Sequence, residues 1–167
     1  MEENGDLTVA RLNPDDADIV SRLVASVIQP LTYYNARARN EETAKYSSVK
    51  LQAMIAEDPD SVLIAVVDNE PAGFCISKYD DGLIWLSWFG TTERFRKKGI
   101  GKKLLSALEN TVGTRRAHKI WCDTRTDNLA SQSVLQAAGF TRVGHFTNHW
   151  YGHDYFIWEK YVEPAPA

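Results

Sequence analysis

Three apolar segments separated by two short turns constrain the fold of this chain most strongly. Residues 62–67 form a continuous apolar run, and the apolar segments 72–79 and 83–90 follow it. The turn sequences 68–71, Asp-Asn-Glu-Pro, and 80–82, Asp-Asp-Gly, separate the three. Segments of this length, bounded by turn residues, are typical of strands joined by hairpins. The sequence therefore predicts an antiparallel meander of three strands.

The segments on either side of the meander alternate between helical and strand patterns. Asn13 is a helix-capping residue type, Pro14 stands at the first helical position, and Gly139 is a residue typical of a helix end. The order of elements predicts an α/β (α+β) fold, in which a mixed sheet carries helices on its faces. Besides the meander, the predicted strands are 7–11, 119–124, 141–150 and 154–162, and the predicted helices are 13–30, 41–57, one that begins near Gly99, and 128–138.

The size and composition of the chain suit one globular domain. The 167 residues, 44% of them hydrophobic, predict a single domain over residues 1–163 and a short tail over 164–167. The longest apolar run is far too short to cross a membrane, and the acidic start of the chain is unlike a secretory signal. The net charge of −3 gives no overall attraction to nucleic acid. We therefore expect a cytoplasmic protein without nucleic-acid or membrane partners. Cys75 and Cys122 are predicted to be buried, reduced thiols.

Residues 94–103 form a basic, glycine-containing segment at the start of a predicted helix. Six of these ten residues are basic, in a chain that is acidic overall. Positive side chains oppose the helix dipole at this end, so they suit a site that an anion visits. Gly99 and Gly101 allow successive backbone N–H groups to turn toward such an anion. The segment predicts a pyrophosphate site, and a solvated basic helix start is the simpler alternative.

Two spaced motifs resemble those of a known enzyme family. Residues 96–101, Arg-Lys-Lys-Gly-Ile-Gly, resemble the Arg/Gln-x-x-Gly-x-Gly/Ala motif of the GNAT acyl-CoA N-acetyltransferases. The second block begins at Asn128 and continues through Ser131 and Leu135 to Gly139-Phe140, with the spacing of the family. The resemblance implies a mixed, mostly antiparallel seven-stranded sheet flanked by about four helices. The sheet would splay into a V between its fourth and fifth strands, with acetyl-CoA lying in the splay.

The resemblance also implies which residues hold the acetyl-CoA cosubstrate. Backbone groups at Phe89 and Thr91 would pair with the pantetheine amides. Asn128 would bond the pantetheine arm, although it is equally well predicted as a helix cap, and Ser131 stands where the family has alanine. The pyrophosphate would be held by Arg96, Lys97, Lys98, Gly99, Ile100, Gly101 and Lys102.

The chain departs from the family pattern where catalysis is concerned. Leu135 stands where many members have a tyrosine that protonates the leaving thiolate, and residues 85–89 lack the glutamate that some members use as a base. Tyr151 and Asp123 are the replacement catalytic candidates. The predicted substrate-binding residues are Tyr33, Tyr34, Trp85 and Ser87. Three further residues, Tyr155, Asp80 and Asp81, are weaker candidates, with packing or a solvated turn as the alternative.

Histidines 145, 149 and 153 are spaced four apart, which would place 145 and 149 on one face of a strand. A hairpin turn between 149 and 153 breaks the geometry of a metal site. We therefore predict no metal.

The sequence as a whole predicts an enzyme that transfers an acetyl group from acetyl-CoA to a primary amine by direct attack. A small-molecule amine is favoured over a peptide N-terminus of the ribosomal-protein type. A catalytically silent CoA-binding or sensor module is the alternative from another class. The resemblance is also compatible with a homodimer.

Overall fold

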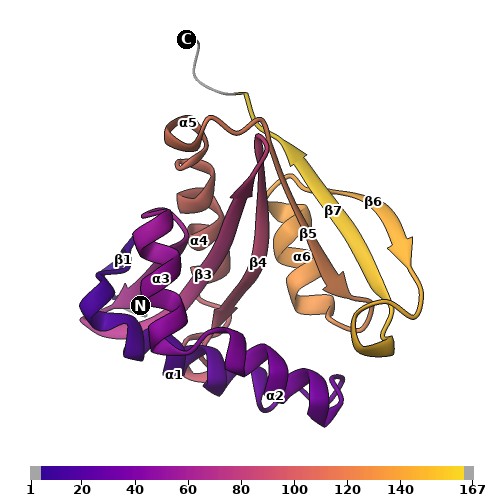
Figure 1. Cartoon of the computed structure of the whole chain (residues 1–167), viewed down its shortest axis with the longest axis horizontal. Coiled ribbons are helices and arrows are strands. Elements are labelled where there is room, and N and C mark those ends of the chain that lie inside the picture. The colour runs from indigo at the N-terminus through magenta and orange to yellow at the C-terminus, as the bar shows by residue number, and fades with distance from the viewer. Residues whose placement is uncertain (1–4, 164–167) are drawn as a thin grey trace.

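A computed structural model of the chain describes residues 5–163. The strands form one seven-stranded sheet in the order β1-β2-β3-β4-β5-β7-β6 (Figure 1). Every neighbouring pair is antiparallel except β4 and β5, which are parallel. This confirms the predicted mixed sheet and its meander. The strands are β1 (Leu7–Arg11), β2 (Val62–Val67), β3 (Glu70–Asp80), β4 (Leu83–Thr91), β5 (Lys119–Arg125), β6 (Thr141–Phe146) and β7 (Tyr155–Tyr161).

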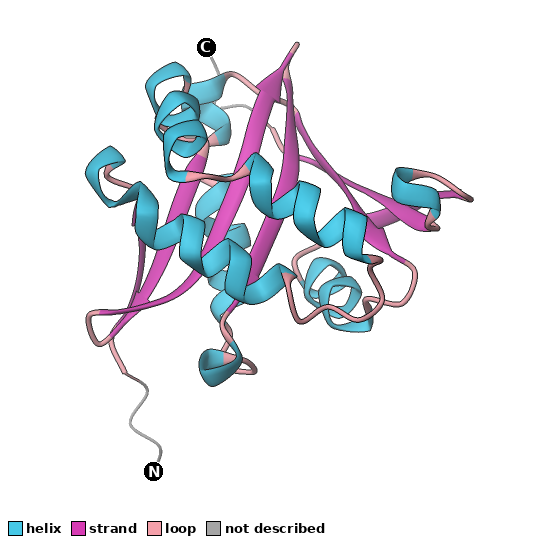
Figure 2. Ribbon diagram, turned by 60° about the horizontal axis from the view of Figure 1, so that its bottom comes forward, coloured by secondary structure: helices cyan, strands magenta, loops and turns pink. Residues whose placement is uncertain are grey.

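Helices cover both faces of the sheet (Figure 2). On one face α1 and α3 pack over the apolar side chains of β2 and β3, including Phe74 and Ile76. On the other face α4 and α6 enclose a second core that contains Leu104, Leu135 and Trp158. The α-helices of the described residues are α1 (Ala17–Ile28), α2 (Ala36–Lys45), α3 (Ser48–Glu57), α4 (Ile100–Glu109), α5 (Val112–Arg115) and α6 (Leu129–Ala137), and 3₁₀ turns occupy 14–16, 93–95 and 150–152.

The predicted helix 41–57 is two helices, α2 and α3, and the short helix α5 was not predicted. Residues 5–163 therefore contain six α-helices rather than about four. The break falls at Tyr46 and Ser47, where Tyr46 leaves helical geometry and Ser47 is extended as the N-cap residue of α3. Serine favours such positions because its side chain competes with helical hydrogen bonding. The buried ring of Tyr46 belongs to the core under α1 and α3, so the chain turns there to bury it.

The predicted strand 141–150 ends early, at Phe146. The chain then turns, with left-handed backbone at Asn148 and Tyr151, and the amide of His149 bonds the carbonyl of His153. Histidines 145 and 149 therefore do not share a strand face. The predicted tail, 164–167, lies outside the described residues.

The parallel pair β4–β5 is short, and the two strands separate beyond it. Pairing extends only along Leu83–Trp85 of β4 and Lys119–Trp121 of β5. Ser87 is then an extra residue of β4 opposite β3, a β-bulge. Because of the bulge, Leu86 packs in the α4 core whereas Trp88, two residues later, packs against the α1 core. Figure 1 shows β4 and β5 diverging toward the end at which α1 and α2 lie, which confirms the predicted V-shaped splay.

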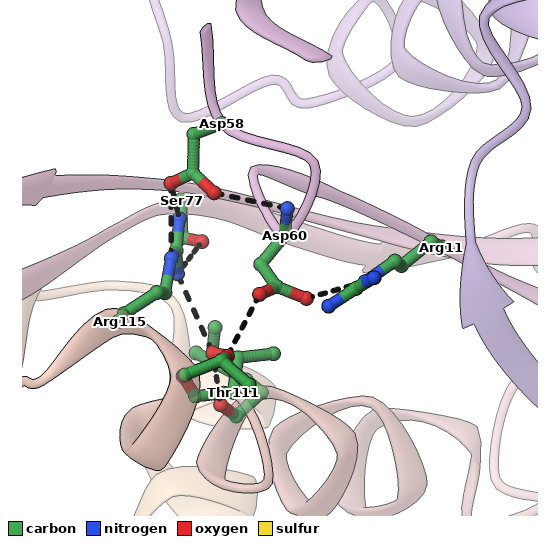
Figure 3. Close-up of polar contacts among 8 residues, drawn as sticks. Arg11, Asp58, Asp60, Ser77, Thr111 and Arg115 are labelled. Carbon is green, nitrogen blue, oxygen red and sulfur yellow. Dashed lines mark hydrogen bonds and ion pairs between the residues drawn. The ribbon is translucent and has the colours of Figure 1, made fainter. Parts of the chain in front are cut away.

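A polar network at the closed end of the V ties three elements together (Figure 3). The buried guanidinium of Arg115, at the end of α5, donates from Nε to Oδ2 of Asp58 at 2.9 Å and from Nη1 to Oγ of Ser77 at 2.9 Å. Asp60 accepts from Arg11 at 2.7 Å and from the Thr114 hydroxyl at 3.0 Å. The network therefore fixes the segment before β5 against β3 and the α3–β2 loop.

Replacing Arg115 with Met is expected to lower the free energy of unfolding by about 2–3 kcal/mol, because it leaves the partly buried Asp58 carboxylate without its partner. Urea unfolding measures the difference. The matched control is Arg116→Met at the neighbouring exposed position, which is expected to change stability by less than about 0.5 kcal/mol. Equal stability of the two variants would contradict a locking role for Arg115.

Candidate active site

A cavity of about 740 Å³ lies at the opening between β4 and β5. Side chains from α2, α3, β3, β4, α5, β5, β7, the start of α6 and the turn 150–152 line it. The cavity reaches the polar network of Figure 3, since Asp58, Ser77 and Arg115 are also among its lining residues. Among the predicted catalytic and substrate-binding residues, those that line the cavity are Tyr34, Trp85, Ser87, Asp123 and Tyr151. Among the predicted cofactor residues, those that line it are Phe89, Asn128 and Ser131. The splay thus brings residues from distant parts of the sequence around one volume.

Aromatic rings form much of the cavity wall. The rings of Trp85 on β4 and Trp121 on β5 stack with centroids 5.8 Å apart, where the two strands still pair. The buried Tyr34 ring lies 6.0 Å from that of Trp88. Tyr33, which is not among the lining residues, packs behind Tyr34 with ring centroids 5.0 Å apart. Its predicted role in substrate binding can therefore only be indirect in this conformation.

Asp123 is a carboxylate in the wall of the cavity, on β5. Its Oδ2 atom accepts a hydrogen bond from Nε1 of Trp150 at 3.0 Å. Burial raises the pKa of the Asp123 carboxyl above its ordinary value, although the Trp150 hydrogen bond works in the opposite direction. A carboxylate in this environment takes up a proton more readily than one in water.

Glu42, on α2, is a second carboxylate of the cavity, and sequence reasoning missed it. Its Oε2 atom accepts from Nε1 of Trp88 at 2.9 Å. Its Oε1 atom accepts from the hydroxyl of Tyr151 at 3.0 Å and from the ammonium of Lys45. Only 13% of the side chain is exposed. Because α2 is polar throughout, with Ala38 as its one buried residue, no apolar stripe indicated which side of the helix faces the sheet.

Tyr151 lies in the 3₁₀ turn 150–152 with left-handed backbone, φ 55°. This conformation carries its ring to the cavity, and its hydroxyl hydrogen is directed at Glu42. Burial and the Glu42 carboxylate raise the pKa of Tyr151, so its hydroxyl stays protonated near neutral pH.

The basic glycine segment forms the start of α4, beside the open end of the V. Gly99 is left-handed with φ 76°, and so is Lys97 with φ 62°. The first helical bond runs from the amide of Lys103 to the carbonyl of Gly99, so the preceding amides have no partner within the helix. A Cβ at Gly101 would lie 3.3 Å from Cγ1 of Val134 on α6 and 3.7 Å from the Phe89 ring. Glycine at this position keeps the helix start close to α6 and to the end of β4.

The second motif has a clear structural part. Oδ1 of Asn128 accepts from the amide of Ser131 at 3.1 Å, which confirms the predicted helix cap. This bond uses only the oxygen of the side chain, so its contact with pantetheine stays a prediction. Leu135 is fully buried in the α4 core, so the residue at the family's tyrosine position contributes packing.

Of the three weaker candidates, Tyr155 lines the cavity, whereas Asp80 and Asp81 do not. Asp80 and Asp81 are exposed at the β3–β4 turn. Within residues 5–163 no group of His, Cys, Asp and Glu side chains could hold a metal ion. Cys75 and Cys122 are buried and free, and burial raises the pKa of Cys75 to about 12. None of the helices described is long and apolar enough to cross a membrane.

Comparison with known proteins gives this architecture a family. Aminoglycoside N(6')-acetyltransferase type 1 of Klebsiella aerogenes is 33% identical over 94 residues, which cover 51% of this chain and 62% of that protein. The chain spans less than two thirds of the length of the curated relatives it matches. A GNAT acetyltransferase structure from Streptococcus pneumoniae superposes with a TM-score of 0.81 at 16% identity, over 95% of this chain and all of that one.

The PaiA N-acetyltransferase of Thermoplasma acidophilum, solved in complex with coenzyme A, superposes with a TM-score of 0.79. It is 21% identical, and the match covers 94% of this chain and 99% of that one. A family model described as the acetyltransferase (GNAT) family matches residues 28–140. This chain therefore belongs to the acetyltransferase (GNAT) family.

Proposed function

We propose that this protein transfers the acetyl group of acetyl-CoA to the primary amine of a small molecule. The observation that carries the proposal is the cavity at the β4–β5 opening, which joins the carboxylates of Asp123 and Glu42 to the predicted pantetheine-binding residues. Family membership supports acetyl transfer, and PaiA, which shares the fold, was solved with coenzyme A. Binding pockets for small molecules typically occupy about 300–1,000 Å³, a range that includes this cavity.

The local structure fits a bound CoA at two places. From Leu86 to Thr91 the edge of β4 that faces β5 pairs with no strand, so its backbone groups can pair with the pantetheine amides. At the start of α4, amides without helical partners and the exposed side chains of Arg96, Lys97, Lys98 and Lys102 face an approaching pyrophosphate. The thioester end of the molecule would then lie among Phe89, Asn128 and Ser131, at the mouth of the cavity.

The acceptor amine must be neutral before its nitrogen can attack the thioester carbonyl carbon. Removing the proton of a lysine-like amine at pH 7 costs about 4.6 kcal/mol, from its ordinary pKa of about 10.4. We assign this proton to the carboxylate of Asp123, whose raised pKa makes it a better base than an exposed aspartate. As the new C–N bond forms, the C–S bond breaks and the sulfur leaves as a thiolate. Tyr151 is the candidate donor to that thiolate, and its hydroxyl, which donates to Glu42 at 3.0 Å in this structure, would turn from Glu42 to the sulfur for this step.

The relative from Klebsiella is named for an aminoglycoside, a small polyamine acceptor. Aromatic walls and two carboxylates also suit a small cationic amine better than an uncharged one. A peptide N-terminus is the alternative acceptor.

Thiol release from acetyl-CoA, measured over a panel of diamines, amino acids, aminoglycosides and short peptides, tests the proposal. We expect thiol release that depends on a small amine and yields one acetylated product per thiol. Tight binding of acetyl-CoA with no transfer to any member of the panel would instead support a CoA-binding module without activity.

A further inference from the structure

The cavity contains a site that already holds an ammonium group of the chain itself. The ammonium of Lys45 donates to Oε1 of Glu42 and lies 5.8 Å from the centroid of the Tyr151 ring. A carboxylate combined with an aromatic face is an arrangement that binds organic cations. The Tyr151 hydroxyl and the indole N–H of Trp88 bond the same carboxylate and hold it in place. Glu42, Tyr151 and Trp88 therefore form a cation-binding site. The ammonium of Lys45 occupies it in this structure.

Lys45 is well placed to leave this site. Its side chain is 54% exposed and lies on the surface of α2, whereas that of Glu42 is 13% exposed. An ion pair between neighbouring helical residues with one exposed partner contributes little to stability, typically about 0.3–0.5 kcal/mol. An ammonium group brought in by a ligand can therefore replace that of Lys45 at little cost.

Asp123, on β5, has a different environment from Glu42. Asp123 accepts the N–H of Trp150 and makes no ion pair with any residue of the described chain. Once Lys45 is displaced, neither Asp123 on β5 nor Glu42 on α2 has an ion-pair partner among the described residues. Other cations do lie nearby: Lys78, Arg115 and Arg125 line the cavity, and the Arg37 guanidinium is 5.9 Å from the centroid of the Tyr151 ring. Two negative groups in one cavity favour a ligand with two positive groups.

We propose, on the basis of the proposed function, that the preferred acceptor is a dibasic amine. Its reacting amine lies at Asp123, and its distal ammonium takes the place of the Lys45 ammonium on Glu42 and the Tyr151 ring. Lys45 thus competes for the distal ammonium site only, and an amine with a single charge binds at Asp123 without displacing it. Glu42 is the specificity-determining residue of the site.

Binding of two matched probes tests the proposal without turnover. Cadaverine is a five-carbon diamine, and the matching amino alcohol has a hydroxyl in place of one amine. Both are titrated by calorimetry into protein saturated with CoA, which carries no acetyl group. We expect cadaverine to bind the native protein about fivefold or more tightly than the amino alcohol. Equal affinity of the two probes would overturn the proposal.

Two substitutions shift this preference in opposite directions. Lys45→Met removes the competitor, so we expect about twofold tighter binding of cadaverine and unchanged binding of the amino alcohol. Glu42→Gln keeps an oxygen for the Trp88 N–H but removes the charge, so we expect about tenfold weaker binding of cadaverine. Weaker binding of cadaverine to Lys45→Met than to the native protein would also overturn the proposal.

The matched controls are Lys50→Met and Glu70→Gln, at exposed positions that do not line the cavity, and neither is expected to alter the preference. The two proposals fail differently. A preference for cadaverine without thiol release would remove the acetyl transfer and leave the dibasic site. Thiol release with equal binding of both probes would leave the acetyl transfer and remove the dibasic site.

Discussion

Replacing Asp123 with Asn is expected to lower kcat for acetyl transfer by about 10²–10³-fold, in line with the loss of a general base. The affinity for acetyl-CoA is expected to stay within about twofold, since Asp123 lies in the acceptor part of the cavity. Asparagine keeps an oxygen that can accept the Trp150 N–H, so the shape of the site is retained. Steady-state kinetics and calorimetric titration of acetyl-CoA measure the two quantities.

The control for this substitution is Asp81→Asn, an exposed carboxylate in the β3–β4 turn whose left-handed backbone asparagine tolerates. It is expected to leave kcat unchanged. A loss of less than about threefold in Asp123→Asn would remove Asp123 from the chemistry, since a positioned general base contributes far more than that.

The pH dependence of the native protein gives an independent signature of Asp123. Because burial raises its pKa, kcat/KM is expected to rise with pH through a value above the ordinary carboxyl range, as the group ionises. That limb is expected to disappear in Asp123→Asn. The free energy of unfolding depends on the Asp123 carboxyl in the opposite direction, falling as pH rises. A carboxyl whose folded pKa is raised contributes stability at low pH and loses it as pH increases, so Asn is expected to be no less stable than Asp at neutral pH.

Replacing Gly101 with Asp is expected to weaken acetyl-CoA binding by about 10²-fold or more, because a carboxylate would stand at the start of α4 where the pyrophosphate is predicted to bind. The new Cβ would also lie 3.3 Å from Val134, so the helix start must shift slightly from α6. Calorimetric titration of acetyl-CoA measures the loss. Gly101→Ala separates the two causes, since it introduces the Cβ without the charge and is expected to lose less than about tenfold.

The matched control is Gly113→Asp, on α5, where an added Cβ would meet no atom within 4 Å. It adds the same charge at a distance from the predicted pyrophosphate site and is expected to bind acetyl-CoA as the native protein does. Binding by Gly101→Asp within twofold of the native value would exclude the α4 start as the pyrophosphate site.

Much of the fold follows from local sequence. Turn residues at 68–71 and 80–82 separate the strands of the meander, and the spacing from Gly99 to Phe140 matches one helix–strand–helix unit. The break at Tyr46 was missed because burial of its ring, rather than local propensity, bends the chain there. The early end of β6 was missed because Asn148 and Tyr151 adopt left-handed backbone that the alternation of residues does not reveal.

The site could be predicted only where one motif or one strand carries it. Asp123 stood out as a carboxylate in an apolar strand, and Asn128 by its position at a helix start. Glu42 did not stand out in the sequence. One of its partners, Trp88, is turned toward α2 by the bulge at Ser87. The other, Tyr151, is brought to the same carboxylate by the turn 150–152. These contacts join residues about 46 and 109 positions apart, and no local pattern encodes them.

A crystal structure of the protein with acetyl-CoA bound is the most direct measurement. The expected result places the pyrophosphate on the amides of residues 97–102, the pantetheine along the unpaired edge of β4, and the acetyl group at the cavity between Asp123 and Phe89. An acetyl-CoA bound outside the β4–β5 opening, or with its acetyl group turned away from the cavity, would contradict the proposed function.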